Sequence, residues 1–236
     1  MRISEVIPAT GIAHDPSTTE GREWLAAVYR RSESAYVRLN MITTVTGAAA
    51  GTDGTSETLS SRVDRAILGI IRADADVVVV GAATVRAEGY LIPRAARLAV
   101  VTVSGDLSGH RFDDDGAGIL LVCPADRADE VRVRAGLRAA EIVPVAGGDD
   151  LAPAAIVEAL SRRGLPRIVC EGGPTLAAGF AAAGVIDEYC ITIAPVLQPV
   201  AHSFLPLPEG SDVATVPVGV LVDDAAFSYL RLRPRS

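Results

Sequence analysis

The chain has 236 residues, of which 49% are hydrophobic and 4% aromatic, and it carries a formal net charge of −7. Nucleic acids and anionic membrane surfaces demand a dense basic face, so this acidic composition excludes both as partners. The chain also lacks an export signal and the roughly 18 consecutive apolar residues of a membrane span, so we expect a cytoplasmic protein.

The first 35 residues are expected to lie outside the main domain. Residues 1–20 are mixed in polarity and rich in turn formers, which predicts a loosely held arm, and the apolar residues of 21–31 share one face of a predicted helix. Residues 36–236 contain neither an internal repeat nor a low-complexity linker. We therefore expect them to fold as a single domain.

Two elements open that domain. The run Y-V-R-L-N-M-I-T-T at 36–44 predicts a strand, and the small residues at 47–54 predict a loop where the backbone can approach a ligand closely. A helix is expected at 61–72, because Ser61 and Asp64 form a capping pair. Its predicted buried stripe consists of Val63, Ile67, Leu68, Ile70 and Ile71.

Strands and helices then alternate along the chain. Strands are predicted at 77–80, 98–103, 118–123, 141–145 and 168–170, and helices at 126–138 and 151–163. This alternation requires crossover connections and therefore predicts a mostly parallel α/β sheet flanked by helices. Three further strands, at 187–194, 216–222 and 226–232, have no long helix between them. They predict an antiparallel region that closes the sheet.

The segment R-I-V-C-E-G-G-P-T-L at 167–176 is one of two motifs in which an apolar strand stops at glycine beside a carboxylate. Pro174 suits the first turn of a helix, so the amides of Gly173, Thr175 and Leu176 are expected to form a site for a diphosphate. A tight turn that needs glycine only for its backbone angles remains the alternative. Glu171 either caps the neighbouring loop or orients a substrate.

The other motif, V-V-V-V-G-A-A-T-V-R-A-E-G-Y at 77–90, places Gly81 at a strand end with Thr84 and Glu88 just beyond it. Desolvation over a cofactor cleft raises the proton affinity of a carboxyl group, so Glu88 is the best candidate for an acid. The alternative is a solvated glutamate paired with Arg86.

Two further polar residues stand near these motifs. Asn40 lies within an apolar strand, where its amide either bridges strands or contacts a ligand. Arg72 ends a predicted helix, where it either complements the helix dipole or clamps a phosphate.

Several other kinds of site have no support. His14, His110 and His202 lack metal-ligand spacing, and the serines lack a G-x-S-x-G elbow. The chain has no lysine and no G-x-G-x-x-G, which argues against a phosphate-loop ATPase and an ordinary Rossmann dehydrogenase. Cys123, Cys170 and Cys190 form no C-x-x-C pair and are expected to be buried thiols.

Taken in order, the segments resemble the reductase domain of riboflavin biosynthesis, a dihydrofolate-reductase-like family that also occurs fused to a pyrimidine deaminase. The two motifs carry most of this resemblance. Shorter matches are L-N-M-I-T-T-V-T-G (39–47), L-S-S-R-V-D-R (59–65), V-V-T-V-S-G (100–105) and V-I-D-E-Y-C-I-T-I-A-P (185–195).

The resemblance implies a dihydrofolate-reductase-like fold, NADPH as hydride donor, and a homodimer. It implies as substrate a phosphorylated pyrimidine, a ribosylamino-pyrimidine 5′-phosphate, whose sugar carbon is reduced to a ribitylamino product. The deaminase zinc signature is missing, so we expect a stand-alone reductase.

The resemblance also assigns residues. Glu88, Glu171 and Asn40 match catalytic positions, and Ser61, Arg72 and Glu88 match substrate contacts. Cofactor contacts are expected from Thr44, Gly81, Thr84, Val85, Thr102, Ser104, Gly172, Gly173, Pro174, Thr175 and Leu176.

The first turn departs from the family pattern S-x-D-G, because Thr46 stands in place of the aspartate. This change leaves two alternatives to the pyrimidine substrate: a reductase of a pterin or another small imine or carbonyl, and a nucleotide-binding protein without turnover. The hydroxyl groups of Thr102 and Ser104 do not distinguish NADPH from NADH.

Overall fold

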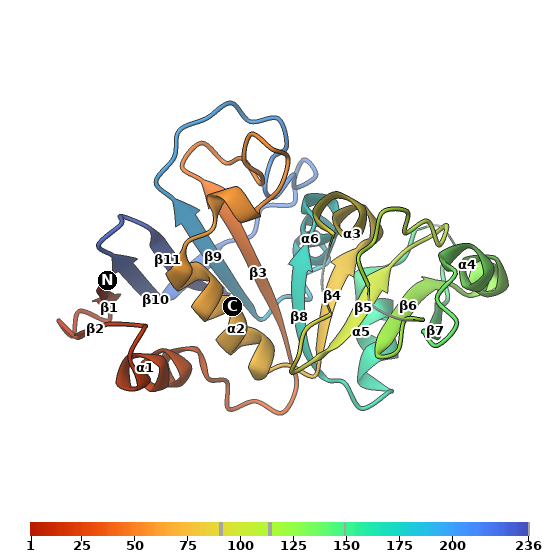
Figure 1. Cartoon of the computed structure of the whole chain (residues 1–236), viewed down its shortest axis with the longest axis horizontal. Helices are drawn as coiled ribbons and strands as arrows, with labels where there is room; N and C mark the ends of the chain where they lie inside the picture. The colour runs from red at the N-terminus through yellow and green to blue at the C-terminus, as the bar shows by residue number, and fades with distance from the viewer. Residues whose placement is uncertain (90–91, 113–114, 149, 236) are drawn as a thin grey trace.

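The strands of the computed structural model, which describes residues 1–89, 92–112, 115–148 and 150–235, form one eleven-stranded sheet. Its order is β2-β1-β10-β11-β9-β3-β8-β4-β5-β6-β7, which runs from left to right in Figure 1. Tyr90, the last residue of the motif at 77–90, lies outside the described residues.

The right half of the sheet is parallel, as predicted. Its six strands are β3 (Tyr36–Thr44), β8 (Arg167–Gly172), β4 (Val77–Gly81), β5 (Arg97–Val101), β6 (Ile119–Pro124) and β7 (Glu141–Val145). Most of these strands are continuous runs of small branched residues, and they are buried because helices cover both faces. All their carboxyl ends therefore meet at one edge.

The left half confirms the antiparallel closure. β9 (Glu188–Ala194) pairs in parallel with β3 but antiparallel with β11 (Ser228–Pro234), which is followed by β10 (Thr215–Asp223), β1 (Ile3–Ile7) and β2 (Ala13–His14). The prediction of a loosely held arm at 1–20 is wrong. β1 pairs with β10, and Ile3 is fully buried. The residues of the arm gave no sign of this pairing, because β10 lies near the opposite end of the chain.

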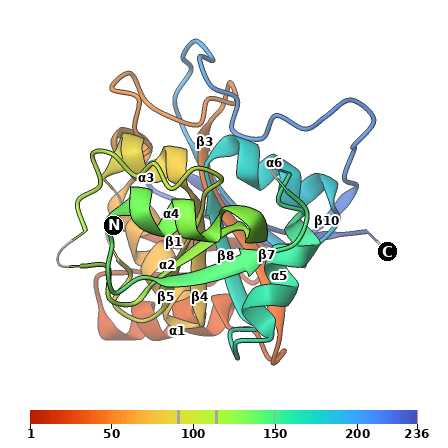
Figure 2. The same cartoon turned by 90° about the vertical axis from the view of Figure 1, so that its right-hand side faces the viewer.

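The helices form two layers, one on each face of the sheet (Figure 2). One layer contains α1 (Thr19–Tyr29), α2 (Arg62–Ala73), α3 (Ala82–Glu88) and α4 (Ala128–Ala135), and the other contains α5 (Pro153–Ser161) and α6 (Pro174–Ala182). Short 3-10 turns, η1 (Glu57–Leu59) and η2 (Ala125–Arg127), precede α2 and α4. Alternate side chains of the central strands pack against each layer, as the period of a strand requires.

Local signals explain where these helices begin and end. Ser61 caps α2, because its Oγ accepts a hydrogen bond of 3.0 Å from the amide of Asp64. Val63, Ile67 and Ile71 are buried as predicted, whereas Leu68 does not join the core. The helix predicted at 126–138 is shorter, because it starts as η2 and ends at a left-handed glycine.

Two further findings concern the chain as a whole. The three cysteines are buried and free, as predicted. Within the described residues, no helix combines the length and the apolar character needed to span a membrane.

Candidate functional site

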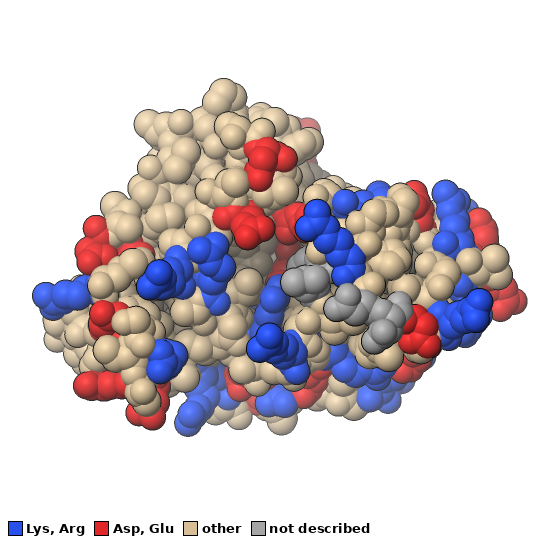
Figure 3. Space-filling view, in the orientation of Figure 1, with Lys and Arg blue, Asp and Glu red and all other residues tan. Residues whose placement is uncertain are grey.

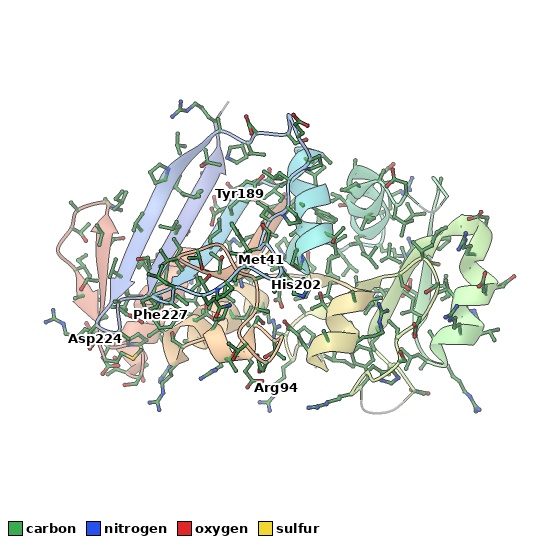
Figure 4. The ribbon with its side chains drawn as sticks, turned by 90° about the horizontal axis from the view of Figure 1, so that it is seen from above. Met41, Arg94, Tyr189, His202, Asp224 and Phe227 are labelled. Atoms are coloured by element: carbon green, nitrogen blue, oxygen red, sulfur yellow. The ribbon has the colours of Figure 1, made fainter. Side chains whose placement is uncertain are left out.

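A cleft of about 1210 Å³ opens at the carboxyl edge of β3, β8, β4 and β5. The helices α2 and α3 and the first turn of α6 form its walls, and the loops at 49–57 and 201–206 form its rim. Figure 4 looks onto this edge, with Met41 and His202 near its middle. Figure 3 shows acidic and basic side chains side by side where the upper loops meet the right half of the molecule.

The cleft brings together most of the site residues that the sequence predicted. Those that line it are Asn40, Arg72, Gly81, Thr84, Glu88, Thr102, Ser104, Glu171, Gly173, Pro174, Thr175 and Leu176. Four predicted residues do not line it: Thr44, Ser61, Val85 and Gly172.

These four residues have roles in the framework instead. Val85 is fully buried in the core, because α3, which the sequence did not predict, turns this side chain inward. Thr44 accepts the amide of Ala48, and Ser61 caps α2 and lies 3.1 Å from the hydroxyl of Tyr229. Gly172 is the last residue of β8 and adopts a left-handed φ of 83°.

The turn between β8 and α6 differs in one detail from the prediction. The amide of Gly173 is not free, because it donates a 2.7 Å hydrogen bond to Oγ1 of Thr84. A Cβ at Gly173 would lie 2.7 Å from that same oxygen, so the close approach of Thr84 requires glycine here. The amides of Thr175 and Leu176 belong to the first turn of α6, where the helix itself offers them no acceptor.

Arg72 and Glu171 form a two-pronged ion pair in the wall of the cleft. Nε of Arg72 lies 2.7 Å from Oε1 of Glu171, and Nη2 lies 2.6 Å from Oε2. Glu171 is 6% exposed and Arg72 25%, so the pair is shielded but still reaches the cavity. The guanidinium of Arg72, which the sequence assigned to a helix dipole or a phosphate, thus fixes the position of the Glu171 carboxyl group.

Glu88 lies at the end of α3 and faces the loop before α2. Its Oε1 accepts a 3.2 Å hydrogen bond from the amide of Ser56. Arg86, its partner in the alternative interpretation of a solvated ion pair, donates instead to the carbonyl of Asp106 at 2.6 Å. Glu88 therefore lines the cleft as a hydrogen-bond acceptor that also ties down the rim.

Asp64 is a cleft residue that the sequence analysis recognised only as part of a helix cap. It is 9% exposed, and its Oδ2 accepts a 2.7 Å hydrogen bond from Oγ of Ser60. Burial raises the pKa of this carboxyl group above its ordinary value. The available signal was spacing, because Asp64, Leu68 and Arg72 recur every four residues beside the apolar stripe.

Two arginines that the sequence did not place also line the cleft with Ser104: Arg86 and Arg111. A Cβ at Gly89 would lie 2.7 Å from Cδ of Arg111, so this left-handed glycine leaves room for the arginine. Thr102 is 4% exposed, and its Oγ1 accepts the amide of Gly105 at 2.9 Å.

Thr46, the departure from the family pattern, connects two loops of the rim. Its hydroxyl donates to the carbonyl of Gln198 at 2.7 Å and accepts from the amide of the same residue at 3.2 Å. An ionised aspartate has no proton to donate to that carbonyl, so threonine makes a contact here that the family residue does not.

Among the described residues, no group of three His, Cys, Asp or Glu side chains is arranged to hold a metal ion. The polar groups of the cleft are instead suited to bind anions and hydroxyl groups. Its lining combines the first turn of α6 and several arginines with Asn40 and the carboxyl groups of Asp64, Glu88 and Glu171.

Comparisons with known proteins identify a family and several relatives. Residues 35–198 match the family model described as the RibD C-terminal domain. The riboflavin biosynthesis protein RibD of Mycobacterium tuberculosis strain H37Rv is 33% identical over 178 residues, which cover 75% of this chain and 46% of that protein. The chain thus spans about half the length of this relative.

A second relative matches over most of its own length. The 2,5-diamino-6-ribosylamino-4(3H)-pyrimidinone 5′-phosphate reductase of Methanothermobacter thermautotrophicus is 29% identical over 205 residues, which cover 81% of this chain and 87% of that enzyme.

Solved structures support the fold. A pyrimidine reductase-like protein from Corynebacterium diphtheriae has a TM-score of 0.72 at 20% identity, covering 90% of this chain and 99% of that one. RibD of Acinetobacter baumannii has a TM-score of 0.69 at 20% identity, covering 87% of this chain and 60% of that one.

Proposed function

Because the chain belongs to the RibD C-terminal domain family, we propose that it is an NADPH-dependent reductase that transfers a hydride to the sugar carbon of a ribosylamino-pyrimidine 5′-phosphate. The observation that carries this proposal is the single cleft in which the first turn of α6 and an acidic wall around Arg72 and Glu171 face one cavity. The homodimer that the resemblance implies is part of the same proposal.

The residues of the cleft fit a nicotinamide dinucleotide. Its volume of about 1210 Å³ exceeds the 300–1,000 Å³ of ordinary ligand pockets, which leaves room for a dinucleotide beside a small substrate. The amides of Thr175 and Leu176 at the start of α6 are suited to hold the diphosphate. When bound, the cofactor supplies the hydride.

Two arginines favour NADPH over NADH. Arg86 and Arg111 line the cleft together with Ser104, beyond the end of β5. A 2′-phosphate is a dianion that guanidinium and hydroxyl groups bind well, whereas the 2′-hydroxyl of NADH gains little from them. The chain has no lysine, so arginines are its available side-chain cations of permanent charge.

The opposite wall is suited to a sugar and a pyrimidine. The amide of Asn40 both donates and accepts hydrogen bonds, and the carboxylates of Glu88 and Glu171 accept them from hydroxyl or amino groups. Arg65 lines the cleft on the exposed side of α2, where its charge attracts a 5′-phosphate. The protein holds the reacting carbon against the cofactor and excludes water, which is a large part of catalysis.

The test is NADPH oxidation with 2,5-diamino-6-ribosylamino-4(3H)-pyrimidinone 5′-phosphate, followed by absorbance, with the ribitylamino product identified by mass. Oxidation with a pterin but not with this pyrimidine would favour the alternative reductase. Cofactor binding without oxidation of NADPH by either compound would favour a silent binding protein.

A variant separates cofactor binding from turnover. Gly173→Val places a branched side chain against Thr84, which displaces the turn before α6. We expect NADPH binding, measured by fluorescence titration, to weaken at least about tenfold, the equivalent of about 1.4 kcal/mol. Unchanged affinity in a folded variant would contradict the diphosphate site.

A further inference from the structure

Asp64 occupies a position that the proposed function does not explain. It lies in the first turn of α2, and Asp64, Leu68 and Arg72 line the cleft at intervals of four residues. Val63, Ile67 and Ile71 of the same helix face the core instead. A carboxylate that served only to cap a helix would lie at the surface, whereas this one is directed into the cavity wall.

The neighbouring strands turn polar groups toward the same side. Cys190 and Val169 pack beneath α2 in the core. Asn40 is the register partner of Cys190, Thr192 lies two residues after Cys190, and Glu171 lies two residues after Val169. Side chains two residues apart in a strand share a face, so all three project toward α2 and Asp64.

The surroundings of Asp64 favour its protonated form. Burial is the largest cause of its raised pKa, and the negative charge of Glu171 on β8 acts in the same direction. Hydrogen bonds from Thr192 and Ser60 and the charge of Arg65 offset part of this shift. Tyr29 of α1 and Tyr229 of β11 are the other titratable groups that face it.

The other carboxyl groups are less suited to donate a proton. Both oxygens of Glu171 accept hydrogen bonds from Arg72, so the guanidinium occupies the positions from which a proton would be passed to a substrate. Oε1 of Glu88 accepts the amide of Ser56, a contact that fixes the side chain to the rim loop. Asp64 instead meets the hydroxyl groups of Ser60 and Thr192, which can accept a hydrogen bond from a protonated carboxyl group as well as donate one.

We propose that Asp64 is the acid that opens the sugar ring of the substrate before reduction, in place of Glu88, the acid expected from the sequence. This inference rests on the proposed function, because a glycosylamine has a ring oxygen on the carbon that bears the amine. The carboxyl proton moves to the ring oxygen, the carbon–oxygen bond breaks toward that oxygen, and the amine lone pair forms a carbon–nitrogen double bond.

The atoms and charges balance. Ring opening leaves a free hydroxyl group, an iminium ion and the Asp64 carboxylate, and the iminium carbon is the atom that the hydride reduces. The carboxylate then regains a proton from water, with Ser60, which also lines the cleft, hydrogen-bonded to it at 2.7 Å. One hydride and one proton are consumed in each turnover.

Ring opening is reversible and needs no cofactor, which provides a direct test. The wild-type protein interconverts the two anomers of the ribosylaminopyrimidine without NADPH, and exchange NMR measures the rate. Asp64→Asn slows this exchange by about 10²-fold or more, the range of general acid catalysis, and Asp64→Glu restores part of it. Asp129→Asn, an exposed change in the distant α4, leaves it unchanged.

The pH dependence of turnover identifies the acid. In the wild type, turnover falls as the pH rises through the pKa of the acid, because the proton is lost. Asp64→Asn is slower and lacks this alkaline decline, whereas Glu88→Gln retains it. NADPH affinity and thermal unfolding of Asp64→Asn stay close to wild type, which separates an acid from a structural residue.

Two results overturn this inference alone. One is anomer exchange in Asp64→Asn at the wild-type rate, and the other is an alkaline decline that disappears in Glu88→Gln but persists in Asp64→Asn. A folded wild-type protein that neither exchanges the anomers nor oxidises NADPH with this pyrimidine would instead remove the proposed substrate, and the ring-opening role with it.

Discussion

Charged groups gather near both ends of β3, on the face of the sheet that α1 and α2 cover, and the two groups differ in how completely their charges are enclosed by the fold. At the amino end of β3, Arg38 and its register partner Glu188 are fully buried. At the carboxyl end, Asp64, Arg72 and Glu171 line the open cleft. The comparison teaches that burial of a charge alone does not identify a functional site.

The closed end uses its charges to fix the fold. Glu188 contacts four arginines at 3.1–3.4 Å: Arg31, Arg38, Arg231 and Arg233. Arg38 and Arg231 also donate to the carbonyls of Tyr29 and Val28, which end α1. The cluster thus joins three strands and a helix, and cations at a helix C-terminus complement its dipole.

The open end leaves charge available for a ligand. Arg72 binds Glu171 in the wall of the cleft, and Asp64 adds a second carboxyl group beside them. These two carboxyl groups and the guanidinium line an open cavity, so they can exchange hydrogen-bond partners when a substrate binds. Glu188 has no comparable freedom, because each of its oxygens meets arginines on several elements.

Replacing Glu188, the carboxylate of the closed end, should have the largest effect on stability. Glu188→Ala leaves buried arginines without their counter-charge, so we expect the free energy of unfolding to fall by about 3–5 kcal/mol, measured by urea denaturation. Glu141→Ala is the matched control, because Glu141 also pairs with two arginines but is 45% exposed, and it should cost about 1 kcal/mol or less. Equal losses of unfolding free energy in the two variants would contradict the difference between the buried and the exposed carboxylate.

Acid should weaken the same cluster. Burial alone would raise the pKa of Glu188, but the hydrogen bond from Arg231 and the charges of Arg38, Arg231 and Arg31 together lower it to about 2. Its ordinary value is 4.5, so the stabilisation is complete above pH 4.5 and is lost as the pH falls toward 2. We expect a loss of about 3 kcal/mol across this window, and a flatter profile in Glu188→Gln.

Glu171→Gln is the corresponding change at the open end. Its amide still accepts from Arg72, which is 25% exposed and can be hydrated, so unfolding should change less than in Glu188→Ala. Loss of a charged substrate contact should instead cost about 1.5–3 kcal/mol of transition-state stabilisation, which lowers kcat/KM roughly ten- to hundredfold. A variant that is strongly destabilised but fully active would place Glu171 in the fold rather than in the site.

A smaller effect is expected at Glu88. Glu88→Gln keeps an oxygen to accept the amide of Ser56 but removes the charge that faces the cleft. We expect kcat/KM to fall by about tenfold with little change in NADPH affinity, since one charge-assisted hydrogen bond is lost. Wild-type kinetics in this variant would remove Glu88 from the site.

The sequence predicted what depends on neighbours along the chain. The apolar runs of β4 and β8 and the glycines that follow them are local signals, so both the parallel sheet and the turn before α6 could be predicted. Val85 was assigned to the cofactor through the resemblance, and α3 was not predicted because it is short and Gly81 provides no side-chain cap for it. Without a predicted helix, the direction in which Val85 faces could not be predicted either.

Contacts between distant segments could not be predicted. Glu188 binds arginines from the connection before β3, from β3 itself and from β11, and no pattern within any one segment indicates that they meet. Asp64 had a sufficient local explanation as a partner in the cap of α2. Only the arrangement of β8 and β9 beneath that helix shows that its carboxyl group faces a cavity.

The smallest predicted effect concerns the rim of the open end, where threonine replaces the family aspartate. Thr46→Val removes the hydroxyl that binds both backbone groups of Gln198, and because the site is exposed, water replaces part of the loss. We expect a cost of about 1 kcal/mol in urea unfolding and a severalfold higher KM for the pyrimidine, since the loop of Gln198 leads into the rim. Thr46→Ser retains the hydroxyl and should resemble wild type. If valine matched wild type while serine did not, the methyl group rather than the hydrogen bonds would hold the two loops together.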